Sequence, residues 1–151
     1  RHIDEAGNFL AEALKFTADK IPENKLRFGL GIGRPEDIVR SIKMGWDMFD
    51  CVIPTREGRH GRLFSQTRTL NGKANNFYET VNITNAKFAK DFSPINAQSQ
   101  LPELQKYSKG YLHYLFKINE SLASRLASLN NLEFYLKMLS EIRGLIKQDR
   151  F

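Results

Sequence analysis

One carboxylate lies inside an apolar stretch of this 151-residue chain. Asp50 falls within the run Met48–Ile53, whose other members are all apolar or weakly polar. A carboxylate in such surroundings costs free energy unless it has a partner or a chemical role. An aspartate can act as a nucleophile that forms an ester with a sugar carbon. It can also cap a loop or pair with Arg56, and its spacing alone favours this structural interpretation.

Two neighbouring segments bear on that choice. Thr55–Arg59 follows Pro54, is strongly basic and is predicted to form a loop. Arginine binds phosphates or base edges in bidentate fashion. For each arginine the alternative is a solvated surface charge. Gly31-Ile32-Gly33 follows an apolar stretch. It would support an unrelated phosphate-binding α/β module, but such a pair of glycines is a weak signal when it stands alone.

The composition narrows the class of protein. With 23 Lys and Arg against 17 Asp and Glu, the formal net charge is +6, which favours anionic partners, nucleic acid first. The single cysteine, Cys51, excludes an intramolecular disulfide and a cysteine-rich zinc site, and it fits a cytoplasmic protein. No apolar run is long enough to span a bilayer. The length predicts one ordinary domain with a real core.

The first third of the chain predicts the elements that must position Asp50. Its apolar periodicity predicts a helix over 1–20, a strand over 27–32, a helix over 35–44 and a strand over 48–53. This order is typical of an α/β fold with a parallel pair of strands. In such folds chemistry lies at the carboxyl ends of the strands. Asp50 and the glycine pair are both expected at that edge.

The rest of the chain changes character. Residues 61–100 are polar, with Asn71-Gly72 as a hairpin-type turn and Val81–Ile83 as a strand. Helices follow. The second of them is predicted to begin near Asn130, because Asn130 and Glu133 have the spacing of a capping box.

Taken together, these segments resemble the queuine tRNA-ribosyltransferases, the tRNA-guanine transglycosylases of bacteria. The similarity runs from about Glu23 to the end, and the Asp50 segment is its most specific part. The segments that carry it are Gly31–Asp37, Asp47–Val52, Pro54–Arg56, Gly58–Gly61, Asn85–Phe88, Asp91–Ile95, Tyr107–His113 and Asn119-Glu120.

The resemblance implies a fold. Family members are (β/α)8 TIM barrels with a zinc-binding insertion before the last helix, and this chain matches the C-terminal part. It would supply the last two strands within 1–60, an insertion subdomain over 61–104 and C-terminal helices over 105–151. The N-terminal barrel half would be missing, so the chain alone is expected to be an incomplete enzyme.

The resemblance also implies an activity and its residues. The family exchanges guanine at the tRNA wobble position for a 7-deazaguanine base, in queuosine biosynthesis, through a covalent ribosyl-enzyme. Asp50 matches the nucleophile, which makes a catalytic carboxylate the expected reason for an acid in this run. Leu30 and Gly31 match residues that line the base pocket. The residues expected to contact RNA are Arg34, Thr55, Arg56 and Arg59.

The chain departs from the family at the zinc site. The positions of the three cysteines and the histidine hold Ser99, Leu101, Leu104 and Asn130. This set cannot act as a normal zinc site, so neither a metal nor another cofactor is expected. The leucines predict an apolar patch there. A homodimer is left open, because the zinc subdomain helps to form the family's interface. The segment Ser65–Thr80 is longer than usual and has no functional account.

Two functions remain in competition. In the first, the chain is the catalytic C-terminal part of a zinc-free transglycosylase. Its partners would be tRNA with guanine at the wobble position, a 7-deazaguanine base and the missing barrel half. In the second, it is a non-catalytic tRNA-binding or partner subunit of a split or decayed transglycosylase. The lost zinc ligands favour the second function, and Asp50 favours the first.

Overall fold

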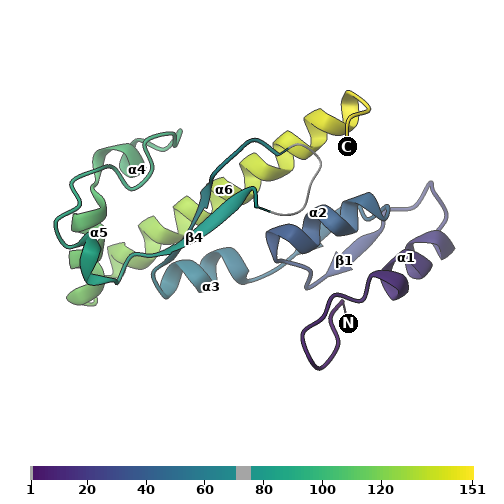
Figure 1. The fold of residues 1–151 in the computed structure, drawn as a ribbon, viewed down its shortest axis with the longest axis horizontal. Coiled ribbons are helices and arrows are strands. Elements are labelled where there is room, and N and C mark those ends of the chain that lie inside the picture. The colour runs from purple at the N-terminus through teal and green to yellow at the C-terminus, as the bar shows by residue number, and fades with distance from the viewer. Residues whose placement is uncertain (1, 71–75) are drawn as a thin grey trace. The chain divides into compact units, whose positions relative to one another are not determined.

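The chain forms two compact units in the computed structural model, which describes residues 2–70 and 76–151 (Figure 1). Unit 1 is built from residues 2–53, Leu70 and 141–151, and unit 2 from 54–69 and 76–140. The division into 1–60, 61–104 and 105–151 stays a prediction.

Unit 1 contains a parallel pair of short strands with helices beside them. Its elements in chain order are α1 (Ala11–Lys20), β1 (Phe28–Leu30), α2 (Pro35–Lys43) and β2 (Met48–Asp50). Strands β1 and β2 pair in parallel, with Leu30 opposite Asp50. The predicted α/β character and the predicted parallel pair are therefore confirmed. The buried side chains of this unit include Leu14, Ile38, Val39 and Trp46.

Local sequence explains where the helices of unit 1 begin and end. Pro35 opens α2 and acidic residues occupy its first turn, as expected at the positive end of a helix dipole. Gly45, with φ +94°, follows the end of this helix. Helix α1 is shorter than predicted, because the Asp4 carboxylate accepts hydrogen bonds from the backbone and side chain of Asn8. That local turn occupies residues expected to be helical.

Unit 2 contains an antiparallel hairpin and helices. Its elements in chain order are α3 (Ile53–Arg59), β3 (Arg62–Gln66), β4 (Tyr78–Asn82), the 3₁₀ helix η1 (Ala86–Phe88), α4 (Pro102–Lys106), α5 (Lys109–Lys117) and α6 (Ser121–Lys147). The first residue of α3 and the last turns of α6 belong to unit 1. Arg62 lies opposite Asn82, and Gln66 opposite Tyr78. The predicted turn at Asn71-Gly72 lies outside the described residues.

Three sequence predictions about elements are wrong. The basic segment after Asp50 is helix α3 and not a loop, and strand β2 ends at Asp50 and not at Ile53. Pro54 explains both findings, since proline suits the first turn of a helix and cannot donate to a strand ladder. Asn130 does not cap a helix, because α6 runs without a break from Ser121 to Lys147.

The core of unit 2 is formed by side chains from its loops, its helices and strand β3. Its buried cluster consists of Leu63, Ile83, Phe88, Ile95, Leu104, Leu112, Leu115, Ala123, Leu126 and Ala127. The strands within 2–70 and 76–151 form two two-stranded sheets and no closed barrel. In these same ranges, none of the helices has the length and apolar character needed to cross a membrane.

Candidate active site

Asp50 stands at the carboxyl end of β2, where the parallel-strand argument placed it. Its Oδ1 accepts a hydrogen bond of 2.8 Å from the backbone N–H of Gly31. Gly31 follows the paired strand β1 and has φ +74°, a left-handed conformation that glycine adopts at little cost. Asp50 is exposed, so the carboxylate is oriented by one backbone donor and accessible from solvent. The apolar neighbours of Asp50 indicated a buried carboxylate, and this expectation is wrong.

Gly33 allows a close approach between two chain segments at this edge. A Cβ at position 33 would lie 2.3 Å from Cys51 Cβ and 2.5 Å from its Sγ. The loop after β1 therefore presses directly against the residue that follows Asp50. This contact explains a glycine at 33 without any phosphate, and it fixes the loop that carries the Gly31 donor.

Leu30 and Arg34 flank the Gly31 donor. Leu30 is 74% exposed and lines a cavity of about 240 Å³ in unit 1 together with Leu14, Phe28 and Trp46. Arg34 is the exposed N-cap residue of α2. The structure thus brings four of the predicted site residues to one region of unit 1: Leu30, Gly31, Arg34 and Asp50.

The other predicted site residues lie on α3 in unit 2. Arg56 and Arg59 are exposed and three positions apart, so they share one face of this short helix. Arg56 Nε lies 3.4 Å from Glu57 Oε1, and Glu57 Oε2 lies 3.2 Å from Arg62 Nη1. Thr55 is partly buried beside them. This cluster carries three arginines and one carboxylate, and its net positive charge suits a phosphate backbone.

A buried asparagine anchors α3, and the sequence analysis missed it. The Asn131 side chain is fully buried, and its Nδ2 donates to the carbonyls of Pro54 and Arg62, each at 2.9 Å. Its Oδ1 accepts from the N–H of Phe64 at 3.0 Å. One side chain thus satisfies three backbone groups, at the start of α3 and along β3. The available signal was an amide pair, Asn130-Asn131, inside an otherwise apolar helical stripe.

Gly58 lets α3 pack closely against α6. A Cβ there would lie 2.8 Å from the backbone nitrogen of Ser128, so only glycine lets α3 approach the backbone of α6 this closely. Together with Asn131, this contact fixes the helix that presents Arg56 and Arg59.

The four positions where the resemblance implies zinc ligands hold Ser99, Leu101, Leu104 and Asn130. Leu104 belongs to the buried core of unit 2, and Leu101 packs against that core, so the predicted apolar patch is confirmed. Ser99 and Asn130 are buried and hydrogen bonded. Leucine offers no donor atom for zinc, so these four positions do not fit the metal. Across residues 2–70 and 76–151 there is no group of three or more His, Cys, Asp and Glu side chains placed to hold an ion.

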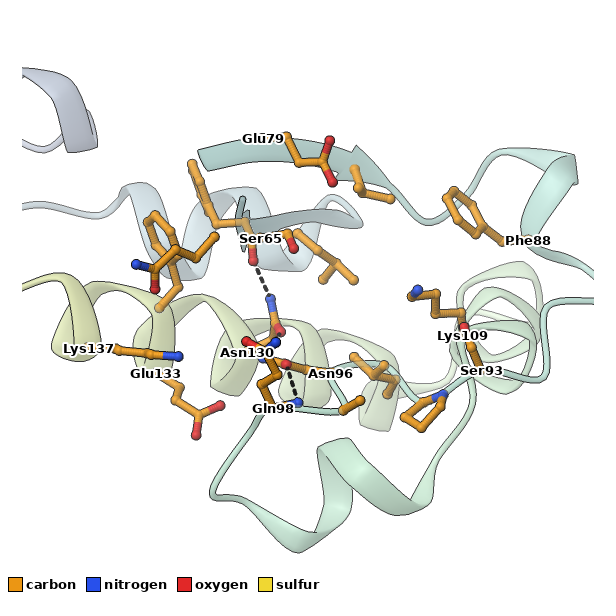
Figure 2. A pocket seen from close by; sticks show the side chains of 18 residues that line it. Ser65, Glu79, Phe88, Ser93, Asn96, Gln98, Lys109, Asn130, Glu133 and Lys137 are labelled. Carbon is orange, nitrogen blue, oxygen red and sulfur yellow. Dashed lines mark hydrogen bonds between the residues drawn. The ribbon is translucent and has the colours of Figure 1, made fainter. Parts of the chain in front are cut away.

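A cavity of about 310 Å³ lies in unit 2, between the β3–β4 hairpin, helix α6 and the loop over 93–98. Figure 2 shows Ser65 and Glu79 on the hairpin, and Asn130, Glu133 and Lys137 on α6. Asn130 reaches toward the hairpin, where its Nδ2 donates to the carbonyl of Phe64 at 3.1 Å. Of the four replaced zinc positions, Asn130 lines this cavity.

Comparison with known proteins identifies the family. The model of the family described as queuine tRNA-ribosyltransferase matches residues 2–151. The chain belongs to the queuine tRNA-ribosyltransferase family. This family assignment confirms the resemblance seen in the Asp50 segment.

Three relatives within the queuine tRNA-ribosyltransferase family illustrate the extent of the match. Proteins of that name from Rickettsia bellii, Rhizobium meliloti and Thermoanaerobacter sp. are 40%, 38% and 38% identical over 144, 149 and 148 residues. These alignments cover 95%, 99% and 98% of this chain but only 37%, 37% and 36% of the relatives. The chain therefore spans little more than a third of the length of the curated relatives that it matches.

Proposed function

We propose that this chain is the part of a tRNA-guanine transglycosylase that carries the nucleophile and an RNA-contacting helix. The observation that carries the proposal is the Asp50 carboxylate, exposed at the end of β2 and oriented by the Gly31 N–H at 2.8 Å. Membership of the queuine tRNA-ribosyltransferase family supports the reaction class. The remaining strands of a (β/α)8 barrel would come from the part of the relatives that this chain does not match.

The chemical step proposed for Asp50 is a double displacement. One carboxylate oxygen attacks C1′ of the wobble ribose, the bond from C1′ to guanine breaks, and its electron pair leaves with guanine. The product is a ribosyl ester of Asp50, as in retaining glycosidases. An incoming 7-deazaguanine then attacks C1′ through its ring N–H nitrogen and gives up that proton, which balances the proton that the departed guanine takes up, and the carboxylate leaves. The Gly31 N–H stabilises the negative charge that returns to Oδ1 in this second step.

The tRNA would be held by Arg34 from α2 and by Thr55, Arg56 and Arg59 from α3. Phosphate contacts position a nucleic acid, and base contacts specify the sequence. The target base must leave its stack before C1′ is accessible. Leu30, exposed beside Gly31, offers an apolar surface for that base. We infer a cytoplasmic enzyme without zinc, and its self-association is left open.

The second candidate function is a non-catalytic tRNA-binding or partner subunit. The replaced zinc positions favour it, because all four differ from the ligand set that the resemblance implies. The third interpretation, a phosphate-binding module built on Gly31-Ile32-Gly33, loses its basis. Contact with Cys51 explains Gly33, and the Asp50 carboxylate uses the Gly31 N–H.

A trapping experiment separates the two functions. The chain is combined with the barrel segment of a relative that it lacks and is incubated with a tRNA that has guanine at the wobble position. A denaturing gel then detects covalent protein–RNA. We expect a band with the wild-type chain and none with Asp50→Asn, while Arg59→Ala should weaken RNA binding and leave the band at saturating RNA.

The outcomes exclude each other. A band that persists in Asp50→Asn would remove Asp50 as the nucleophile. RNA bound to the wild-type chain without any band would favour the non-catalytic subunit. An Arg59→Ala variant with unchanged affinity and unchanged salt dependence would show that α3 does not contact the RNA.

A further inference from the structure

The resemblance implies a zinc site at four positions of this chain, and a chain without that metal needs another link at this place. The four positions hold Ser99, Leu101, Leu104 and Asn130, which do not fit zinc. The segment 96–105 nevertheless stays attached to α6. The side chain that holds it there is Glu133, one helical turn beyond Asn130.

Both oxygens of Glu133 accept a hydrogen bond from the facing segment. Ser99 Oγ donates to Oε2 at 2.6 Å, and the backbone N–H of Gln100 donates to Oε1 at 2.6 Å. These are short contacts to a charged acceptor, and such bonds are about twice as strong as neutral ones. Ser99 is buried and Glu133 is partly buried, so water competes weakly for the Ser99 bond.

Ser99 is also hydrogen bonded to other residues of the same segment. Its Oγ accepts from the N–H of Leu101 at 2.9 Å, and its N–H donates to the carbonyl of Asn96 at 3.2 Å. Gln105 donates from its side chain to the Ser99 carbonyl. The segment that Glu133 holds is therefore internally braced, and it places Leu104 in the core of unit 2.

Asn130 supplies a second, neutral link. Its Oδ1 accepts from Asn96 Nδ2 at 3.4 Å, and the N–H of Asn96 donates to the Leu104 carbonyl at 3.0 Å. Figure 2 shows Asn130 and Glu133 on α6, with Asn96 and Gln98 on the loop across from them. Both α6 side chains thus contact the same segment, one through a carboxylate and one through an amide.

The geometry points to Glu133 as the replacement for the family's metal: this carboxylate of α6 anchors segment 96–105 through Ser99 and Gln100, and the fold of unit 2 is independent of zinc. A metal ion ties four side chains together at one point. Here the segment is held by two hydrogen bonds to the Glu133 carboxylate and by the apolar contacts of Leu101 and Leu104. The inference concerns folding and does not depend on the proposed activity.

The first test measures metal and stability on the 151-residue chain. Elemental analysis is expected to find no stoichiometric zinc, and thermal melting is expected to give the same midpoint with and without EDTA. One zinc per chain that survives purification, or a melting temperature that falls with EDTA, would overturn the inference.

The second test compares Glu133→Ala and Glu133→Gln with Glu79→Gln. Glu79 is an exposed glutamate on β4 and lines the same cavity, so its variant controls for loss of charge. We expect Glu133→Ala to lower the melting temperature by about 5–10 °C, and Glu133→Gln by less, since its amide nitrogen cannot accept a hydrogen bond. The control should match the wild type.

Hydrogen exchange makes the test specific. The Gln100 N–H should be protected in the wild type and should exchange at least about tenfold faster in Glu133→Gln, while the amides of β3 and β4 keep their protection. If Glu133→Ala fails to fold, Glu133→Gln decides. A Glu133→Gln variant that matches Glu79→Gln in melting and in Gln100 exchange would overturn the inference.

Discussion

The carboxyl edge of β1–β2 and the junction between segment 96–105 and α6 differ in how they resemble the family. At the edge, the expected residues stand in their expected places: Asp50 ends its strand, and Gly31 directly follows the neighbouring one. At the junction, all four expected ligands are different residues, yet the junction is closed and buried. Under the proposed function the first region presents a reacting atom, whereas the second only joins two segments.

That difference has a physical basis. A nucleophile needs one functional group at one position, and no other side chain can substitute at the same reach and charge. A structural link is defined by its contribution to stability, and many combinations of contacts contribute similarly. Substitution of the nucleophile should therefore lower the rate of base exchange and leave the free energy of unfolding unchanged. Substitution of a buried link should lower the free energy of unfolding.

The largest expected effect is that of Asp50→Asn on the rate of base exchange. With the segment of a relative that this chain does not match supplied, the rate should fall at least about 10⁴-fold, since no carboxylate remains to form the ester. Asparagine keeps an oxygen that accepts from Gly31, and position 50 is exposed, so stability should change by less than about 0.5 kcal/mol. Steady-state kinetics and thermal melting of the same preparation check both parts. A variant that loses activity only because it unfolds would break the comparison.

Asn131→Ala tests the opposite case, a buried link without chemistry. It removes the partners of the Pro54 and Arg62 carbonyls and of the Phe64 N–H. Each unsatisfied buried group costs about 1–3 kcal/mol, so we expect a loss of about 3–5 kcal/mol. Denaturant unfolding measures it. Exposed Asn85, as Asn85→Ala, is the control; equal unfolding free energies for the two variants would contradict the assigned role.

Gly33→Ala probes a link within the edge itself. The added methyl would lie 2.3 Å from Cys51 Cβ, and relief of such overpacking costs about 1–3 kcal/mol. Gly144→Ala is the matched control, because a Cβ there meets nothing within 4 Å and alanine favours a helix over glycine by roughly 1 kcal/mol. Chemical unfolding should show a lower free energy of unfolding for Gly33→Ala and a higher one for Gly144→Ala than for the wild type. A neutral Gly33→Ala would return the glycine pair to a ligand-binding explanation.

The sequence could predict the elements whose signals are local. The apolar runs gave β1 and β2, and Pro35 with its acidic first turn gave α2. The Asp50–Gly31 hydrogen bond was within reach too, since parallel strands bring their ends together. The helical nature of Thr55–Arg59 was missed, because a proline that ends a strand and one that opens a helix are the same letter.

Tertiary contacts determine the features of the fold that local sequence signals do not predict. Asn130 and Glu133 have the spacing of a capping box, but α6 continues through them because its buried stripe runs from Ala123 to Met138, with the hydrogen-bonded pair Asn130-Asn131 inside it. Glu133 is used by Ser99 and Gln100, which are more than thirty positions away in sequence. Strand β3 depends on β4 and on Asn131 for its backbone partners. No short window of sequence contains such pairings.

The smallest expected effect distinguishes the two units by their response to pH. Burial raises the pKa of Asp37 in unit 1, and Glu36 adds to this, while Arg34, Arg40 and His2 oppose it. Hydrogen bonds from the hydroxyl and N–H of Ser93 lower the pKa of Asp91 in unit 2, with Lys109 contributing less.

The two carboxyls should therefore contribute to stability with opposite signs. The folded state holds the Asp37 proton more tightly than the unfolded chain does, so ionisation of Asp37 destabilises the fold as pH rises from 3.8 through its raised pKa. Asp91 contributes stability that is complete above 3.8 and is lost as pH falls through its lowered pKa. Relative to the wild type, Asp37→Asn should gain in melting temperature as pH rises from 3.8 through the raised pKa of Asp37. Asp91→Asn should lose in melting temperature, relative to the wild type, as pH rises through the lowered pKa of Asp91 to 3.8. Differences that do not vary with pH for either variant would show that these carboxyls act through packing alone, and the contrast between the units would then lie in their shapes and not in their charges.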